Sequence, residues 1–365
     1  MKKLDRYIIV KFLSTFFFCL LLLTAIVVVV DLSEHTDDFV KSKLPMGKII
    51  TEYYFGFIPR IDAMLFPLFV FISVIFFTSK MAGRSEVIAI LSSGVSFRRF
   101  MLPFMVGGFI LAGLLWFGYQ YVVPKANKIW GDFDRKYVEV NKRGASNESR
   151  GYKEDIYFKL NADSYVGIKG YDTTSKTGRN FFVQQFKGNK LLYNLRAANF
   201  SWDTAQKKWS LANGSERRFA EKTETVTNFE KLVKSYDFKP LDLGKDEYLK
   251  DQMSTPELTR FIGLEAMRGS ETLNSLLVER YNRDAVPFSV LILTLIGVSL
   301  ASRKVRGGSG VHLAVGVLLC VVYILFSRVS IVFATQGSFS PWLAAWTPNI
   351  IFGFIALYLY KQAPK

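Results

Sequence analysis

The stretch IIVKFLSTFFFCLLLLTAIVVVV at residues 8–30 sets the fold class of this chain. A transmembrane helix needs about 20 consecutive apolar residues, so this run is long enough to cross a bilayer. The chain starts with the basic stretch MKKLDRYIIVKF, which overlaps this run, and a signal peptide also begins with a basic segment and an apolar core. However, bulky Val residues and Asp31 follow it, where a cleavage site needs small residues. We therefore expect a membrane span that is retained.

Five further apolar runs reach or approach spanning length. Three of the six runs precede a long polar stretch, and three follow it. The pattern predicts an α-helical polytopic membrane protein with six transmembrane helices, arranged three plus three around an insert. The predicted spans are residues 8–30, 55–78, 101–123, 285–302, 311–333 and 342–360.

The insert changes the hydrophobic period from helical to alternating. Its segment NFFVQQFKGNKLLYNL at 180–195 reads as two short strands around a hairpin turn at 187–189, and further turns are predicted at 203–206 and 213–214. Short strands at this spacing indicate an antiparallel sandwich, barrel or jelly roll. Helices are expected to flank it at 131–142 and 254–268. The insert is either an inert domain or a surface that binds an apolar ligand or a partner domain.

These patterns divide the chain into three parts. Residues 1–123 form the first transmembrane half, residues 124–282 the β domain with its flanking helices, and residues 283–365 the second transmembrane half. The formal net charge is +16, and many cations outside the insert lie beside the apolar runs. Cytoplasmic loops are rich in Lys and Arg, so both termini are predicted to be cytoplasmic and the insert external. Because membrane flanks explain these basic clusters, nucleic-acid binding is disfavoured.

Catalytic and metal-binding motifs are missing from the sequence. No G-x-x-x-x-G-K-[ST] pattern for nucleotide phosphates occurs. His35 and His312 are not paired for zinc or for a nucleophile triad, and Cys19 and Cys320 lie inside apolar runs. We therefore expect a protein without a cofactor that is not an enzyme.

Charged residues near the outer ends of the spans are the candidate binding groups. Ionisable side chains at membrane depth are costly and tend to face a cavity or a partner. They either snorkel or pair locally, as Arg60 with Asp62 and Arg283 with Asp284, or they form an outward ring that holds anionic phosphates. The ring candidates are Lys41, Lys43, Arg60, Arg283 and Arg328.

The loop between the second and third runs, GRSEVIAILSSG at 83–94, predicts one short helix. Ser85 is placed to cap it, and Glu86 suits its positive N-terminal end. Gly94 is a natural stop. Apolar side chains supply a surface, so this is either an interfacial helix or a contact for a partner; they are Val87, Ile88, Ile90 and Leu91.

Five stretches together resemble the YjgP/YjgQ permease family, the LptF and LptG subunits of the lipopolysaccharide exporter. They are LDRYIIVKFLSTF at 4–16, DLSEHTDDF at 31–39, GRSEVIAILSSGVSFRRF at 83–100, ERYNRDAVPFSVLILTLIGVSLASR at 279–303 and SPWLAAWTPNIIF at 340–352. Their order and spacing cover both membrane halves, whereas the insert matches by size, position and β character alone.

The resemblance implies a specific assembly in the inner membrane of a Gram-negative bacterium. Two related permease subunits form a heterodimer, each with a periplasmic β-jellyroll. An LptB-like cytoplasmic ABC ATPase dimer drives them, and an LptC-like single-span subunit and an LptA-like periplasmic bridge complete the path. Lipopolysaccharide is extracted from the outer leaflet of the inner membrane. The loop helix becomes the coupling helix for the ATPase, with Glu86 as an ion-pair partner; its residues are Arg84, Ser85, Glu86, Val87, Ile88, Ile90 and Leu91.

Two other readings of the sequence remain open at this stage. One is the permease of another lipid or lipoprotein exporter. The other is a non-transporting membrane scaffold whose periplasmic domain binds a protein.

Overall fold

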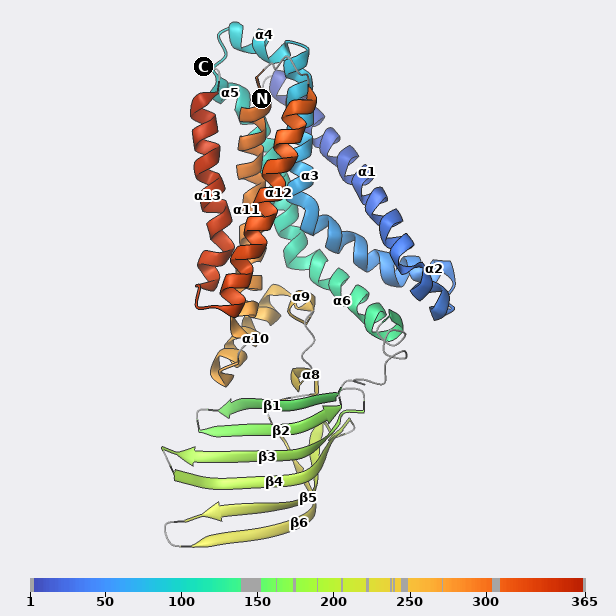
Figure 1. Cartoon of the computed structure of the whole chain (residues 1–365), viewed down its shortest axis with the longest axis vertical. Helices are drawn as coiled ribbons and strands as arrows, with labels where there is room; N and C mark the ends of the chain where they lie inside the picture. Colours follow the sequence, from blue (N-terminus) through green and yellow to red (C-terminus); the bar gives the residue numbers. More distant parts are fainter. Residues whose placement is uncertain are drawn as a thin grey trace. The chain divides into compact units, whose positions relative to one another are not determined.

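The computed structural model shows two compact units (Figure 1). The helical unit comprises residues 1–137, 250–258 and 274–365, and the β unit comprises residues 138–249 and 259–273. The structure describes residues 3–138, 152–161, 163–172, 175–188, 190–204, 206–220, 223–236, 238, 240–243, 249–270, 272–303 and 309–363.

Among the described residues, six helices are long and apolar enough to cross a membrane, and they match the six predicted spans in number and order. The π-helical segments η1 and η2 continue the second and third spans without a break, from Met46 to Gly83 and from Phe97 to Phe133. The elements of these spans and their connections are α1 (Lys3–Ser42), α2 (Met46–Ile49), η1 (Ile50–Tyr54), α3 (Phe55–Gly83), α4 (Glu86–Ser92), α5 (Phe97–Phe117), η2 (Gly118–Val122), α6 (Val123–Phe133), α11 (Leu273–Ala301), α12 (Ser309–Gln336) and α13 (Pro341–Gln362).

Small residues let the helices approach closely. A Cβ atom at Gly107 of α5 would lie 2.6 Å from the Phe12 ring of α1, and one at Gly297 of α11 would lie 2.8 Å from Val74 of α3. Close packing of this kind drives helix association in a bilayer, where burial of apolar surface gains little. In the spans of α3 and α11, 61% and 67% of the most apolar window is buried, against 6% in α1. Most of the apolar surface of α1 is therefore left for lipid or another helix.

Six antiparallel strands form one sheet in the β unit, and each strand pairs with the next along the chain. The predicted turns at 187–189 and 203–206 are confirmed at their described residues, because β3 ends at Lys187, β4 runs from Lys190 to Asp203, and β5 begins at Lys208. Residues 189 and 205 lie outside the described ranges. The strands are β1 (Tyr152–Asn161), β2 (Ser164–Asp172), β3 (Thr177–Lys187), β4 (Lys190–Asp203), β5 (Lys208–Phe219) and β6 (Glu224–Lys234).

The predicted turn at Asn213-Gly214 is wrong, because both residues lie inside β5 and the ladders to β4 and β6 continue past them. The signal was nevertheless physical. Asn213 has a φ of 53°, in the left-handed region that turns use, and Asn180 of β3 has a φ of 51°. Ala198 of β4 lies between these two residues across the ladders. The left-handed residues therefore mark a line across the sheet.

The sheet folds over along this line, which we call the crease (Asn180, Ala198 and Asn213). Lys234 of β6 pairs with Trp209, whereas Glu216 lies seven positions further along β5. In straight strands the Cα atoms of Lys234 and Glu216 would lie about 23 Å apart, too far for their side chains to meet. In the structure Lys234 Nζ lies 2.8 Å from Glu216 Oε1. The folded sheet encloses a buried core of apolar side chains, including Phe181, Leu195, Phe200, Trp209 and Leu211.

The expected antiparallel β domain is thus confirmed, as one unclosed meander of six strands. Its strands follow one another in sequence, unlike the Greek-key order of a jelly roll. The sheet folds over because of the backbone conformation at the crease. An alternating sequence pattern predicts strands but not such a bend, so it does not distinguish a folded meander from a sandwich, a barrel or a jelly roll.

Three short or amphipathic helices lie between the sheet and α11 in the sequence: α8 (Pro240–Leu243), α9 (Leu249–Gln252) and α10 (Thr255–Arg268). The predicted capping interaction of α10 is confirmed. The Ser254 N–H and Oγ–H both donate to Glu257 Oε2, at 2.9 and 2.7 Å. These hydrogen bonds favour the ionised carboxylate and lower the pKa of Glu257. The other predicted flank, 131–142, is helical through α6 and η3 (Asp134–Val138), and residues 139–142 lie outside the described ranges.

Candidate functional site

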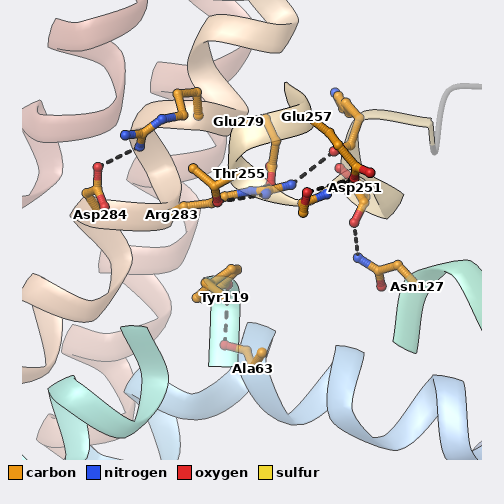
Figure 2. Close-up of polar contacts among 12 residues, drawn as sticks. Ala63, Tyr119, Asn127, Asp251, Thr255, Glu257, Glu279, Arg283 and Asp284 are labelled. Atoms are coloured by element: carbon orange, nitrogen blue, oxygen red, sulfur yellow. Dashed lines mark hydrogen bonds and ion pairs between the residues drawn. The ribbon is translucent and has the colours of Figure 1, made fainter. Parts of the chain in front are cut away.

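A buried arginine organises one end of the helical unit. Arg283 on α11 is 1% exposed, and its guanidinium donates three hydrogen bonds. Nε reaches Glu279 Oε1 at 3.0 Å, one terminal nitrogen reaches Thr255 Oγ1 at 3.1 Å, and the other reaches the Lys250 carbonyl at 3.0 Å. Figure 2 shows Glu279 and Thr255 beside the Arg283 side chain. A buried charge is tolerated where it is paired and hydrogen-bonded in this way.

The same cluster ties the segment before α10 to two spans. Asn127 of α6 donates to the Asp251 carbonyl at 2.8 Å, and Lys250 Nζ donates to Ser275 Oγ of α11 at 2.7 Å. A Cβ atom at Gly131 of α6 would lie 2.5 Å from the amide nitrogen of Gln252. The glycine therefore allows α9 to approach α6 closely. These contacts hold residues 250–255 against α6 and α11 within the helical unit.

Asp251 is a carboxylate of this cluster that lies outside the spans. Burial raises the pKa of the Asp251 carboxyl above its usual range, and Lys250, Arg60, Arg283 and Arg328 act against that rise. Four cations thus lie close enough to influence one buried acid. The cluster can therefore balance charge internally, without an external ion.

The two predicted local ion pairs are wrong. Asp284 accepts from Arg280 at 2.7 Å and from the Trp116 indole at 3.2 Å, not from Arg283. Residues four apart on a helix face one another, whereas adjacent residues do not, so Arg280 is the natural partner.

The same rule separates Arg60 from Asp62 on α3. Asp62 accepts from Thr24 of α1 at 2.6 Å, and the Arg60 guanidinium lies over the Trp130 ring at 3.9 Å, a cation–π arrangement.

The structure brings three of the five predicted ring residues together. Arg60, Arg283 and Arg328 all lie near Asp251, and Arg328 contacts the sulfur of Met64, one helical turn from Arg60, at 3.3 Å. Arg328 is exposed, and no carboxylate pairs with it in the described part of the chain.

Lys41 and Lys43 lie elsewhere, at the end of α1. Both are exposed, and Lys43 has a φ of 54° just beyond the helix. Within the described residues they share no hydrogen bond or ion pair with the three arginines. Arg283 is buried, and three of its guanidinium donors are hydrogen-bonded within the chain.

The predicted loop helix is present as α4, at the opposite end of the helical unit (Figure 1). Gly94 has a φ of 85° and ends it as expected. The predicted cap is wrong: Ser85 has a φ of 62° and its side chain makes no capping hydrogen bond. Glu86 Oε1 lies 3.9 Å from Arg84 at the surface.

The apolar side chains of α4 serve two purposes. Val87 is fully buried in the core of the helical unit, and Ile90 and Leu91 pack against that core. Ile88 alone of the four points away, with 52% of its surface exposed. Most of the predicted partner surface therefore seats α4 on the span ends, and the outward face includes Arg84, Glu86 and Ile88.

Sequence reasoning missed Asp251, Asn127, Lys250 and Tyr119, whose hydroxyl donates to the Ala63 carbonyl at 3.5 Å (Figure 2). The partners of these residues are distant in sequence, and their segments carry no periodic pattern. One local signal was available, the four-residue spacing of Glu279 and Arg283.

Comparison with known families gives one match. The model described as lipopolysaccharide export system permease LptF/LptG matches residues 6–362. No individually curated protein matches the chain significantly.

Proposed function

The chain belongs to the LptF/LptG family of lipopolysaccharide export permeases, and from this premise we propose that it is one half of an ATP-driven permease pair. The pair extracts lipopolysaccharide from the outer leaflet of the inner membrane and passes it to an LptA-like periplasmic bridge. The family match across both membrane halves and the insert is the observation that carries this proposal.

The proposed orientation places both termini in the cytoplasm and residues 124–282 in the periplasm. Its support is the Lys and Arg content of the loops next to the N-terminus, α4 and the C-terminus. In this orientation α4 faces the cytoplasm, and the Arg283 cluster and the β unit belong to the periplasmic side.

We assign coupling to an LptB-like ATPase dimer to the outward face of α4. Val87, Ile90 and Leu91 fix the helix to the span ends. Arg84, Glu86 and Ile88 then offer a rigid patch with both charges and one apolar side chain. Nucleotide hydrolysis by the partner would reach the spans through the residues that seat the helix.

The second permease subunit and an LptC-like single-span subunit are proposed to cover exposed span surfaces. The apolar window of α1 is the least buried of the six. A helix that exposes this much apolar surface suits a lipid-facing or interface position.

Phosphate groups of the lipid are assigned to Arg328, Arg60, Lys41 and Lys43. Arg328 is the leading residue because it is exposed and its planar guanidinium suits bidentate phosphate binding. Arg283 is given a different role: it holds residues 250–255 against α11.

The test uses the full chain, purified with its co-expressed partners and reconstituted in vesicles that contain lipopolysaccharide. ATP is expected to release lipopolysaccharide to a soluble acceptor. Glu86→Ala and Ile88→Asp should lower both ATPase association and release. Glu224→Ala is the matched control, because Glu224 also forms an exposed ion pair, 3.5 Å from Arg217 on the sheet.

Each outcome separates one part of the proposal. Release of lipoprotein with no release of lipopolysaccharide overturns the substrate. Normal association and release in both α4 variants overturns the coupling role and leaves the permease role intact.

A further inference from the structure

The β unit carries a cavity of about 670 Å³ on its sheet. Small-molecule sites commonly have volumes of about 300–1,000 Å³. Phe182, Arg196, Ser215 and Asn228 lie opposite one another on β3 to β6 and all line it. Their side chains share the face opposite the apolar core, since strand neighbours such as Phe181 point into that core. The cavity also borders the apolar core, because Phe181 and Ala197 of that core and Phe229, which packs against it, contribute to its lining.

The charge of this cavity has one sign. Lys169 of β2 and Arg196 of β4 contribute to its wall, and no Asp or Glu lines it among the described residues. Neither cation forms an ion pair or a hydrogen bond within the described ranges. Two free cations without a carboxylate favour an anionic ligand.

Three asparagine side chains give the cavity groups that both donate and accept. Asn180, Asn213 and Asn228 line it, and their amides have no hydrogen-bond partner in the part of the chain that the structure describes. A carboxamide offers a carbonyl acceptor and two N–H donors. Hydroxyl groups also donate and accept, so a polyhydroxylated ligand matches this set.

Two of these asparagines have an uncommon backbone conformation. Asn180 and Asn213 have φ of 51° and 53° inside β3 and β5, on the crease. Left-handed residues other than glycine are disfavoured and gather at functional sites. Beside them, a Cβ atom at Gly214 would lie 2.2 Å from the Arg196 carbonyl, so the strands approach closely here. The crease thus positions two amides on the cavity wall.

Aromatic rings complete the lining. Phe182 and Phe229 both contribute to the cavity and are half-buried. An aromatic face attracts the C–H groups of a sugar ring, which carry partial positive charge. A bare inorganic anion would use the cations and leave the rings and amides without a function.

We propose that this cavity binds an anionic saccharide, with Lys169 and Arg196 holding its acidic group and the asparagine amides its hydroxyls. The choice of natural source rests on the proposed function: the saccharide is either the lipid-linked glycan of the export substrate or a free acidic oligosaccharide.

Binding is tested by calorimetry on the full chain in detergent. The probes are the lipid-free oligosaccharide released from lipopolysaccharide by mild acid, a neutral maltooligosaccharide, inorganic phosphate and adenosine monophosphate. Saturable binding of the acidic oligosaccharide is expected. Arg196→Gln should weaken it roughly tenfold, the usual size for one lost charge-assisted hydrogen bond. Lys208→Gln, an exposed cation of β5 that does not line the cavity, should leave it unchanged.

A second variant separates a saccharide site from a simple anion site. Phe182→Leu keeps both cations and should weaken the oligosaccharide while leaving weak phosphate binding unchanged. The proposal is overturned if Arg196→Gln binds normally, if no probe binds, or if phosphate or the nucleotide binds as tightly as the oligosaccharide.

Competition by intact lipopolysaccharide assigns the lipid-linked source, and binding without competition assigns a free one. Transport assays are independent of this measurement. A chain that exports lipopolysaccharide but binds no oligosaccharide overturns only this inference, and the reverse result overturns only the proposed function.

Discussion

The two ends of the helical unit use charged side chains in opposite ways. At the Arg283 end, three donors of one guanidinium meet three acceptors inside the chain. At the α4 end, Arg84 and Glu86 are 3.9 Å apart at the surface. The first arrangement is buried and complete, whereas the second leaves its charges available to another molecule.

This difference indicates which end should be sensitive to mutation in isolation. A buried charge that loses its partner is strongly destabilising, but an exposed pair contributes little. The Arg283 end should therefore govern stability. The charges at the α4 end should matter only when a partner is present. Substitutions at both ends test this division.

The largest effect is expected for Arg283→Ala. It leaves Glu279, the Thr255 hydroxyl and the Lys250 carbonyl without their donor. Loss of one member of a buried ion pair costs about 3–5 kcal/mol. The free energy of unfolding is measured by detergent titration in mixed micelles.

Arg280→Ala is the matched control on the same helix. Arg280 pairs with Asp284 at 2.7 Å, but both side chains are partly exposed. The expected loss is about 0.2–1 kcal/mol. Equal losses in the two variants would contradict the distinction between the buried and the exposed pair.

Asp251→Asn should change how stability depends on pH. Burial raises the pKa of the Asp251 carboxyl, so the folded state favours the protonated form. Its stabilising contribution is complete below the ordinary value of 3.8 and is lost as pH rises through the raised pKa. Relative to the Asn variant, the native chain should lose about 1.4 kcal/mol for each unit of that rise. Unfolding titrations at a series of pH values measure the difference.

Glu257→Gln provides the opposite sign. Hydrogen bonds from Ser254 lower the pKa of Glu257, so its contribution is present above 4.5 and is lost as pH falls through the lowered pKa. If both variants showed the same direction of pH dependence, the roles assigned to the two carboxylates would be incorrect.

Patterns that depend on neighbours in sequence predicted much of this fold. The six spans were visible because a bilayer demands long apolar runs. The hairpin turn after Lys187 and the capping of α10 by Ser254 and Glu257 involve residues one to three positions apart. Each of these features is set by local chemistry, so one sequence was enough.

Features that depend on distant contacts were not predictable. Arg283 binds Thr255 and the Lys250 carbonyl, 28 and 33 positions away. Asn213 gave a turn signal because its conformation is turn-like, but pairing on both sides keeps it within a strand. The sequence predicted that α4 is a helix with apolar side chains, but it did not predict which of these side chains face the core.

Ser85→Gly should stabilise the α4 end slightly. Ser85 has a φ of 62°, a left-handed conformation that costs an L-residue about 1–2 kcal/mol and glycine almost nothing. Glycine also loses more conformational freedom on folding, by about 0.5–1 kcal/mol. A net gain of about 1 kcal/mol or less is expected, measured by the same unfolding titration.

Ser93→Gly is the control: Ser93 has a φ of −77°, so glycine should destabilise there. Stabilisation by both variants would rule out relief of left-handed strain.

The smallest effect on stability, and the sharpest contrast, is expected for Ile88→Asp. Ile88 is 52% exposed, and surface substitutions away from packed or capped positions usually change stability by about 0.5 kcal/mol or less. In the isolated chain the variant should therefore unfold like the native protein. In the presence of the ATPase subunit it should bind more weakly, because the new carboxylate must be desolvated at an apolar contact. Affinity is measured by titrating the purified ATPase onto the full chain.

Val87→Asp is unsuitable for this purpose, since Val87 is fully buried and its loss would disturb the fold. If the Ile88→Asp chain binds the ATPase normally, the outward face of α4 is not the ATPase contact, and Arg84 and Glu86 serve some other contact.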